Sequence, residues 1–516
     1  CRKCDRTRPV CQRCIDRGLE CGGYPDKFRF CGVASRGKHR GENPFSSSSS
    51  TTMSSSNESG FPSNPSTASG TPPLANTSTP LTSLSLASFP SPAGSSPAES
   101  QSQLQLERIE SQSTDYGSVH SPDTSHQLEE LLMAPHANEL LMYFDQEICP
   151  HEIVGRDQFG NPFRENFLPL VNEHAGVLHA VLGVSASHRD LARGTIKQLE
   201  AEALEHRLQA ILTLSKLLDR EKQNLLRPSE QDALLAIMVI LVLHDLTESG
   251  ISSHGAHLTG ATYMCERLII NDGLVQRKRT LYLLSYLAWM DLMRGFSEPR
   301  KVTFSQESRM KIVAASGNSF AIMAGCPRDI FLAMGDILSA AKEHVTGLMP
   351  SMEFRQILAE REQYLRKWDA DKYQYPTDDP QWRLLGNAFR HALLLRLLRL
   401  PDWSEKPSSS ADIQHSVSVI LDAASAIPET SPLMNGLTLP LFMAGADSLA
   451  PYQRHYIRMR LQHIQIGTNH KNGTHEILDR IWAGSALTPR DDKANVPWIN
   501  FVHSDNSERQ QDFLTW

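Results

Sequence analysis

The residues whose types and spacing could form a chemical site are the cysteines at the beginning of the sequence. Cys4, Cys11, Cys14 and Cys21 are separated by six, two and six residues, and Cys1 stands three positions before the first of them. Thiolates this close together in sequence are typical ligands of Zn²⁺, which binds four sulfurs in a tetrahedral shell. The spacing therefore predicts a zinc site at these residues.

The residues between these cysteines offer almost no apolar surface. Only Val10, Ile15 and Leu19 are large and apolar, and their neighbours are mostly charged or polar. Such a segment has to obtain its folding free energy from the metal, about 10–16 kcal/mol for a structural zinc site. A catalytic zinc is disfavoured, because catalytic sites keep an open position and usually use His or carboxylate ligands.

The residues around the cysteines follow a specific pattern: Lys3-Cys4-Asp5, Arg8-Pro9, Cys14, Gly18-Leu19-Glu20-Cys21 and Tyr24. Together with the spacing, this pattern resembles the fungal Zn(2)-Cys(6) binuclear cluster of transcription factors. In that family six cysteines hold two zinc ions. The resemblance implies that Cys4, Cys11, Cys14 and Cys21 are the third to sixth ligands, and that Cys11 bridges both ions.

The sequence departs from the family pattern before Cys4. The family has a C-x2-C pair whose second Cys lies seven residues before the third ligand, whereas only Cys1 stands there in this sequence. Cys1 is either that second ligand displaced or an unrelated residue, and Cys31 lies too far along to be a family ligand. Four thiolates would hold one zinc ion but leave the second without its shell. We expect the gene product to extend upstream and to supply the missing pair.

The same resemblance implies how DNA would be read. In the family a Lys shortly before the third ligand contacts the base edges of a CGG triplet in the major groove. The expected base contacts here are Arg2 and Lys3, in a first helix that ends near Cys4. Arg13 and Arg17 are the expected phosphate contacts from the second helix. Double-stranded DNA is the implied partner, and a homodimer would pair two triplets at a spacing set by the linker.

The distribution of charge favours a polyanion bound at one end of the chain. Residues 1–40 carry eleven Lys and Arg against four Asp and Glu, a net charge of +7. The whole chain carries −7, which leaves −14 for the rest. A basic module on an acidic body is typical of nucleic-acid binding by the module. The basic residues from Lys27 to Arg40 either follow the phosphate backbone or form a solvated tether.

Residues 41–127 are dominated by Ser, Thr and Pro. Such a segment contains too little apolar surface to offset its conformational entropy, so we predict a disordered linker between the zinc cluster and the remaining chain. Leu104, Leu106 and Ile109 could begin a dimerising helix, but no heptad repeat continues from them.

From residue 128 to 516 apolar residues recur at helical spacing and strand patterns are scarce, which predicts an all-α domain. The run Ala233–Leu243 is apolar on all sides and predicts a central buried helix, because a membrane helix needs about 20 residues. Helices are predicted at 138–148, within 167–193, and at 196–226, 277–293, 329–342, 354–368, 382–400 and 413–427. The first should end before Pro150. The helix at 196–226 should have one apolar side, made of Leu199, Ala203, Leu208, Ile211, Leu214, Leu217 and Leu218.

Short motifs in this part follow a second family pattern: Phe167-Leu168-Pro169-Leu170, Leu178-His179-Ala180-Val181-Leu182, Ser185-Ala186-Ser187-His188, His257-Leu258-Thr259-Gly260-Ala261, Gly325-Cys326-Pro327 and Pro440-Leu441-Phe442-Met443-Ala444-Gly445-Ala446. In this order, behind the cysteine motif, they resemble the fungal-specific regulatory domain of transcription factors. The resemblance implies an all-α fold without known catalytic residues.

No further pattern predicts a reaction centre. The sequence contains no Gly-rich phosphate loop after a strand and no G-x-S-x-G motif. The remaining His, Cys and Arg residues of interest are expected to be core or surface residues: His179, His188, His254, His257, Cys149, Cys265, Cys326, Arg390, Arg396 and Arg399. For the three arginines we expect a solvated or ion-paired face, and for the three cysteines small core side chains.

The pattern as a whole predicts a zinc-dependent, sequence-specific regulator of RNA polymerase II transcription, acting in the nucleus with the transcription machinery, and no enzyme. Five of the nine cysteines lie in residues 1–21, which favours metal binding in a reducing compartment over disulfides. No membrane association is expected, and the sequence identifies no small-molecule effector. The alternative is a regulatory or partner-binding protein whose defective zinc cluster no longer binds DNA.

Overall fold

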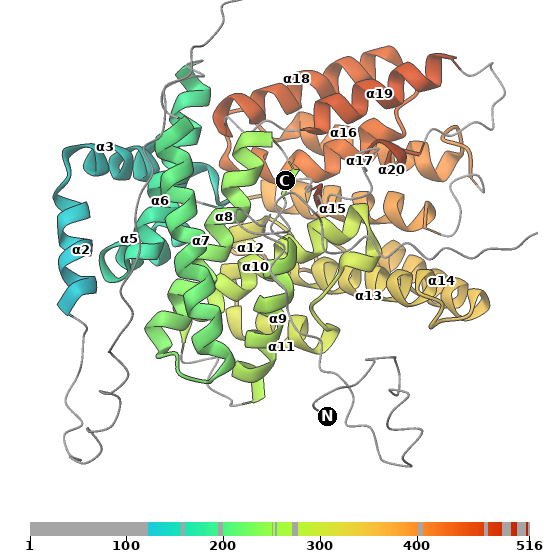
Figure 1. Cartoon of the computed structure of the whole chain (residues 1–516). Helices are drawn as coiled ribbons and strands as arrows, with labels where there is room; N and C mark the ends of the chain where they lie inside the picture. The colour runs from blue at the N-terminus through green and yellow to red at the C-terminus, as the bar shows by residue number, and fades with distance from the viewer. Residues whose placement is uncertain are drawn as a thin grey trace, which may run out of the picture. The chain divides into compact units, whose positions relative to one another are not determined.

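A single apolar helix, α8 (Pro228–Ser249), lies at the centre of the first group of helices along the chain. Every side chain from 233 to 243 is at most 1% exposed. The helices that contact it most extensively are α6 (Ala175–Arg193), α7 (Glu200–Lys222) and α10 (Lys278–Ser297) (Figure 1). The predicted central buried helix is thereby confirmed.

The protein is represented by a computed structural model. It describes residues 122–155, 160–193, 200–249, 251–252, 255–270, 277–400, 406–468, 473–487, 497–502 and 512–513. All of them belong to one compact unit, Val119–Trp516. Among these described helices none combines the length and the apolar character needed to cross a membrane.

The described chain starts with a helix earlier than the sequence pattern predicts. α2 (Pro122–Met133) begins six residues before residue 128, where we placed the end of the linker. α3 (Pro135–Tyr143) follows, and one π-helical turn and one 3-10 turn continue it to His151. The helix thus ends before Pro150, as predicted, and Pro150 itself lies within the 3-10 turn.

The predicted helical stretch 167–193 is divided into α5 (Pro162–Glu173) and α6. The residue between them, His174, has an extended backbone (φ −149°, ψ 115°), which ends the first helix. The start of α5 is fixed by Asn161, whose side chain accepts a hydrogen bond from the backbone N–H of Arg164 at 2.9 Å. This cap adds to Pro162 at the first helical position, where its fixed φ is favourable.

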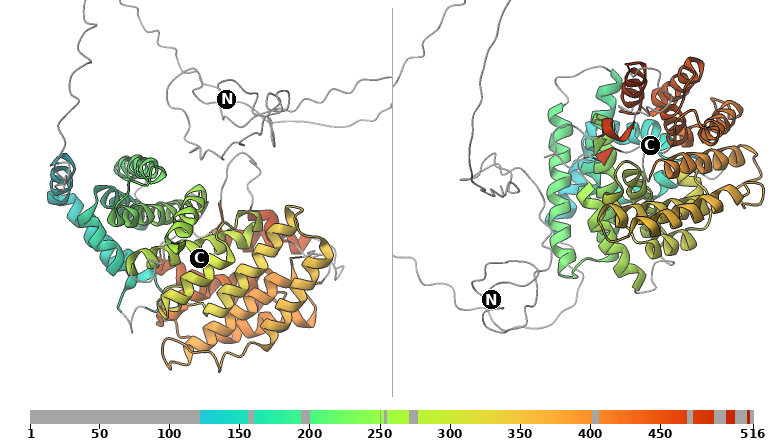
Figure 2. Two further views of the ribbon diagram at one scale, coloured as in Figure 1. Left: turned by 90° about the horizontal axis from the view of Figure 1, so that it is seen from below. Right: turned by 90° about the vertical axis from the view of Figure 1, so that its right-hand side faces the viewer.

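The remaining helices form the second half of the unit. They are α9 (Gly255–Ile270), α11 (Gln306–Ser316), α12 (Ser319–Ala324), α13 (Arg328–Val345), α14 (Ser351–Lys367), α15 (Gln381–Leu398), α16 (Ala411–Ala426), α17 (Thr438–Ala446), α18 (Pro451–Thr468), α19 (Gly473–Leu487) and α20 (Ile499–Val502). Short 3-10 turns span Pro299–Lys301 and Pro432–Leu437. Figure 2 shows α13 to α19 on one side of α8 and α10, and α2 to α7 on the other.

The strands of the described residues form a single two-residue pair. β1 (Ile251–Ser252) follows α8 directly and pairs in antiparallel fashion with β2 (Asp512–Phe513), with Ile251 opposite Phe513. The domain is all-α apart from this pair, as predicted. The pair brings the last described residues to the end of the central helix.

The apolar stripe of α7 is narrower than its sequence indicates. Ala203, Leu214 and Leu217 are buried as predicted, but Leu208 is 49% exposed, and its neighbours Leu204 and Leu212 are 58% and 46% exposed. The reason is that α7 contacts α6 and α8 with one side only. The prediction that Leu208 belongs to the buried side of this helix is therefore wrong.

Two helical glycines test how closely the helices around α8 approach one another. A Cβ atom on Gly176 of α6 would lie 2.5 Å from Thr213 Cγ2 on α7, whereas a Cβ on Gly260 of α9 would meet Met238 Cε at an ordinary 3.5 Å. We expect Gly176→Ala to lower the free energy of unfolding by about 1–3 kcal/mol through overpacking. The control Gly260→Ala should be neutral or stabilising by up to about 1 kcal/mol, since Ala favours the helix.

Urea unfolding of the full chain, followed by helical circular dichroism, measures both effects. Equal stability of Gly176→Ala and the unmodified protein would contradict the close approach of α6 and α7.

Candidate functional site

The predicted zinc ligands and DNA contacts lie outside the described residues. These are Cys1, Cys4, Cys11, Cys14, Cys21, Arg2, Lys3, Arg13 and Arg17. They remain predictions from the sequence, and the same holds for Cys31 and His254. Within the described residues, no group of three or more His, Cys, Asp or Glu side chains could hold a metal ion.

The three cysteines of the helical domain are core residues, as predicted. Cys149, Cys265 and Cys326 are free thiols and fully buried. Burial raises the pKa of Cys265 to about 12, with a further contribution from the neighbouring charge of Glu266. Burial likewise raises the pKa of Cys149 and Cys326 above the ordinary range. Protonated thiols in apolar surroundings are inert as nucleophiles and poor as metal ligands.

The histidines of α6 each contact one other ring. His179 Nδ1 lies 2.9 Å from His206 Nδ1 on α7, and burial together with the charge of His206 lowers the pKa of His179 to about 4. His188 is buried, and its Nδ1 lies 2.9 Å from the hydroxyl of Tyr143. His188 is a histidine of the domain interior, in agreement with the prediction, whereas His179 is half-buried.

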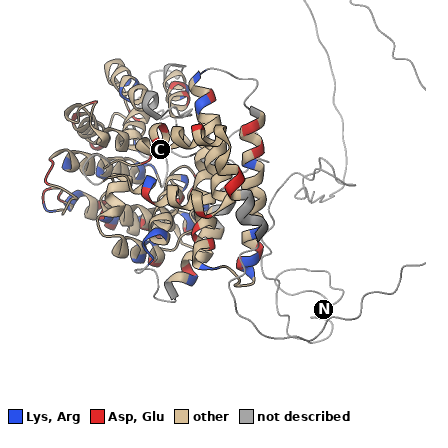
Figure 3. Cartoon of the chain, turned by 90° about the vertical axis from the view of Figure 1, so that its left-hand side faces the viewer, with Lys and Arg blue, Asp and Glu red and all other residues tan. Residues whose placement is uncertain are grey.

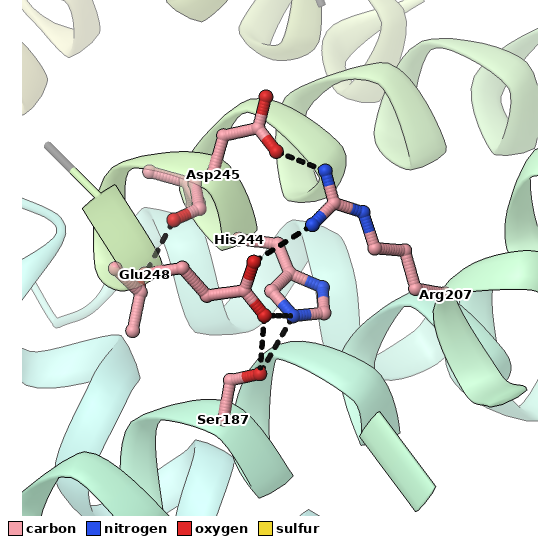
Figure 4. A network of polar contacts seen from close by, with 7 residues as sticks. Ser187, Arg207, His244, Asp245 and Glu248 are labelled. Atoms are coloured by element: carbon pink, nitrogen blue, oxygen red, sulfur yellow. Dashed lines mark hydrogen bonds and ion pairs between the residues drawn. The ribbon is translucent and has the colours of Figure 1, made fainter. Parts of the chain in front are cut away.

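A polar cluster joins three helices near the C-terminal end of α8 (Figure 4). Ser187 of α6 places its Oγ 2.7 Å from His244 Nε2 and donates to Glu248 Oε1 at 3.0 Å. Arg207 of α7 donates to Glu248 Oε2 at 2.8 Å and pairs with Asp245. The cluster thus contains a hydroxyl, an imidazole, a guanidinium and two carboxylates.

The geometry of this cluster does not match a hydrolytic triad. In a triad the acid holds one ring nitrogen and the nucleophile contacts the other. Here both Ser187 and Glu248 lie against the same nitrogen, His244 Nε2, and the buried Nδ1 has no hydrogen-bond partner. The arrangement connects α6, α7 and α8, and it does not activate a nucleophile.

The carboxylate at the centre of this cluster is strongly stabilised in its charged form. Burial alone would raise the pKa of Glu248, but hydrogen bonds from His244 and Ser187 and the charge of Arg207 lower it to about 2. Sequence analysis missed this cluster because its members are far apart in the chain. Their only local signal was a polar residue directly after the apolar run of α8.

The arginines of α15 form no basic face. The Arg396 side chain is buried, its Nε donates to the carbonyl of Phe296 at 2.9 Å, and burial lowers its pKa to about 10. Arg399 is also buried and pairs with Asp447. An ion-paired Arg399 agrees with our expectation, but the expected solvated or ion-paired position of Arg396 is wrong.

The described surface carries both signs of charge. Figure 3 shows Lys and Arg interspersed with Asp and Glu along the helices of the side that faces the viewer. Many of these charges are paired with a neighbour, for example Arg279 with Glu173 at 3.0 Å. A mixed surface of this kind lacks the single-sign stripe that is typical of a nucleic-acid interface.

Two protein-family models match the chain. The one described as "Fungal specific transcription factor domain" covers residues 139–513, and the one described as "Fungal Zn(2)-Cys(6) binuclear cluster domain" covers residues 2–30. The first match spans most of the chain and nearly all of the described helices. The second contains Cys4, Cys11, Cys14 and Cys21. No curated protein and no solved structure was found to match.

The buried histidines predict how stability depends on pH. Burial lowers the pKa of His391 to about 3 and that of His179 to about 4, both below the ordinary 6.5. The unfolded chain therefore binds protons near pH 6.5 that the folded protein does not bind. Stability from this source is complete above pH 6.5 and falls as the pH decreases toward 4 and below.

We expect His391→Gln to reduce the slope of the free energy of unfolding against pH between 6 and 4 by up to about 1.4 kcal/mol per pH unit. Ser416→Ala is the matched control, because Ser416 Oγ lies 3.1 Å from His391 Nδ1 but does not titrate. It should lower stability without changing the slope. Urea unfolding at a series of pH values measures both, and an unchanged slope in His391→Gln would refute the assignment.

Proposed function

Because the chain belongs to the fungal-specific transcription factor family, we propose that it recognises CGG-type triplets in DNA and thereby regulates RNA polymerase II transcription in the nucleus. Its Zn(2)-Cys(6) cluster domain binds zinc, and the protein is a DNA-binding transcriptional regulator rather than an enzyme. The observation that carries the proposal is the occurrence of both family domains, in this order, on one chain. The spacing of Cys4, Cys11, Cys14 and Cys21, which lie within the matched cluster segment, is consistent with it.

We assign the zinc ligands and DNA contacts within residues 1–40. Cys4, Cys11, Cys14 and Cys21 hold zinc, and Cys1 is a further candidate ligand. From the family pattern we infer that Arg2 and Lys3 reach guanine acceptors in the major groove. Arg13 and Arg17 contact phosphates, which fixes the orientation on the duplex without adding sequence information.

We divide the roles of the chain between its two ends. The net charge of +7 in residues 1–40 against −14 elsewhere assigns the attraction to DNA to the first segment. The mixed charges of the helical domain favour contacts with proteins, including a second copy of the chain and the transcription machinery. In this proposal the linker connects the two.

The first test removes one bridging thiolate. We expect Cys11→Ser in the full-length protein to lower its zinc content and to weaken its binding to a CGG-containing duplex. The loss of affinity should be at least about 10³-fold, because specific binding is typically at least that much tighter than non-specific binding. The reason is that the segment has no apolar core to hold its fold once the metal is lost. Metal analysis and a binding titration give the two values.

Cys31→Ser is the matched control, since Cys31 lies beyond the ligand spacing of the family. It should keep both zinc and DNA affinity. If the unmodified protein binds zinc but shows no preference for the CGG duplex, the proposal is wrong. The protein would then be a regulator that acts through partner proteins alone.

The second test separates base contacts from phosphate contacts. Lys3→Ala should relax the preference for CGG over a mutated triplet by about 1–3 kcal/mol. Arg13→Ala should weaken binding to both duplexes equally and reduce the slope of log affinity against log salt by about 1. Titrations of both variants at several salt concentrations decide this, and a loss of sequence preference in Arg13→Ala would reverse the two assignments.

A further inference from the structure

The side of α7 that faces away from the domain core is apolar. Leu204, Leu208 and Leu212 follow one another at intervals of four residues and are 58%, 49% and 46% exposed. Residues at this spacing are neighbours on one side of a helix. The opposite side, with Ala210 and Leu214, is buried in the domain core. A helix that is apolar on two opposite sides is typical of one that is covered on both.

We call Leu204, Leu208 and Leu212 the leucine stripe of α7. No other part of the described chain covers these side chains, since each of them keeps about half of its surface exposed. They form one continuous patch, whereas single exposed apolar residues are normal on any protein surface. A continuous apolar patch on a helix is a surface for another helix to pack on.

The charged residues beside the stripe indicate which partner it fits. Glu205 and Lys216 are both exposed. They lie on the same flank of the stripe, because eleven residues are about three turns of a helix. No described carboxylate lies within ion-pair distance of Lys216, whereas Arg220, further along the helix, pairs with Glu230 at 2.6 Å. This flank of α7 thus has an acidic first half and a basic second half.

Such a flank is complementary to itself when two copies of α7 lie antiparallel. A two-fold axis brings the same flank of both helices together and reverses their direction. If Leu208 of one copy lies level with Leu212 of the second copy, the reverse pair forms by symmetry. Glu205 then lies within about 1.5 Å, the rise of one residue, of the level of Lys216 in the second copy. The register that pairs the leucines therefore also forms two ion pairs.

We propose that the leucine stripe of α7 is a surface through which two copies of this chain associate, with their α7 helices antiparallel and Glu205 paired with Lys216 of the second copy. The inference rests on the proposed function in naming a second copy as a partner, and it adds the surface and the orientation. The stripe is short, and interfaces below about 1,200 Å² are typical of weak and transient contacts. Two cluster domains on neighbouring triplets would strengthen the association, because the second contact then forms within one complex.

The first experiment is sedimentation velocity of the full-length protein without DNA, from about 1 to about 100 µM, where a dimer with micromolar Kd forms. Leu208→Gln should raise this Kd at least about tenfold, because each dimer contains the change twice. Met459→Gln is the matched control, since Met459 of α18 is an apolar side chain that is 50% exposed. It should leave Kd unchanged. A monomer at all concentrations overturns the proposal, and so does an equal Kd of Leu208→Gln and the unmodified protein.

A charge exchange tests the orientation. Lys216→Glu alone and Glu205→Lys alone should each raise the Kd of the dimer by about fivefold, because two exposed ion pairs become two repulsive contacts. The double variant restores both pairs with reversed signs, so its Kd should return to within about twofold of the original value. Both positions are exposed, and helical circular dichroism should be the same for all three variants. Absence of recovery in the double variant overturns the antiparallel pairing.

The zinc-ligand variant separates this inference from the proposed function. Cys11→Ser should lose zinc and DNA binding but keep the Kd of the dimer, because the leucine stripe belongs to the helical domain. A failure of CGG recognition would leave the self-association intact. Loss of the dimer in Cys11→Ser would instead place the contact in the cluster domain and overturn its assignment to α7.

Discussion

The apolar middle of α8 has no side that could face water, and the helices around it are arranged to cover it completely. Burial of apolar surface alone would not fix the position of one helix along the axis of another, because apolar contacts are non-directional. Direction comes from the polar residues at both ends of the run. At one end Thr280 and Arg277 contact Asp232, and at the other Ser187 and Arg207 contact Glu248. Burial therefore positions the helix, and charged hydrogen bonds set its register.

Two different sources of free energy stabilise this chain. The helical domain obtains stability from buried apolar area, whereas the zinc cluster domain depends on a metal, since its sequence contains almost no apolar side chains. The two can therefore fail separately. We therefore expect loss of zinc to abolish DNA recognition without unfolding the helices, and a cavity in the helical domain to leave zinc binding intact.

Local patterns predicted what depends on neighbouring residues. The buried position of Ala233–Leu243 followed from a run that is apolar on all sides, and it is confirmed. The four cysteine ligands were proposed from their spacing and the residues between them, and they stay a prediction. Long-range partners could not be predicted. Nothing near Arg396 indicates that its Nε meets the carbonyl of Phe296, and nothing near Glu221 indicates a pairing with Arg267. The prediction that Leu208 is buried was wrong for a related reason. Periodicity gives the direction of the apolar face of a helix, but it does not give how much of that face the neighbouring helices cover.

The pairing of β1 with β2 has a consequence for the synthesis of the protein. Ile251 follows the central helix, but its partner Phe513 is translated only after all other helices. The strand pair cannot form until that residue has left the ribosome. Helices α6 to α8 can associate before this strand pair forms. A chain that stops before Phe513 would therefore leave Ile251 without its strand partner, although the two residues are far apart in sequence.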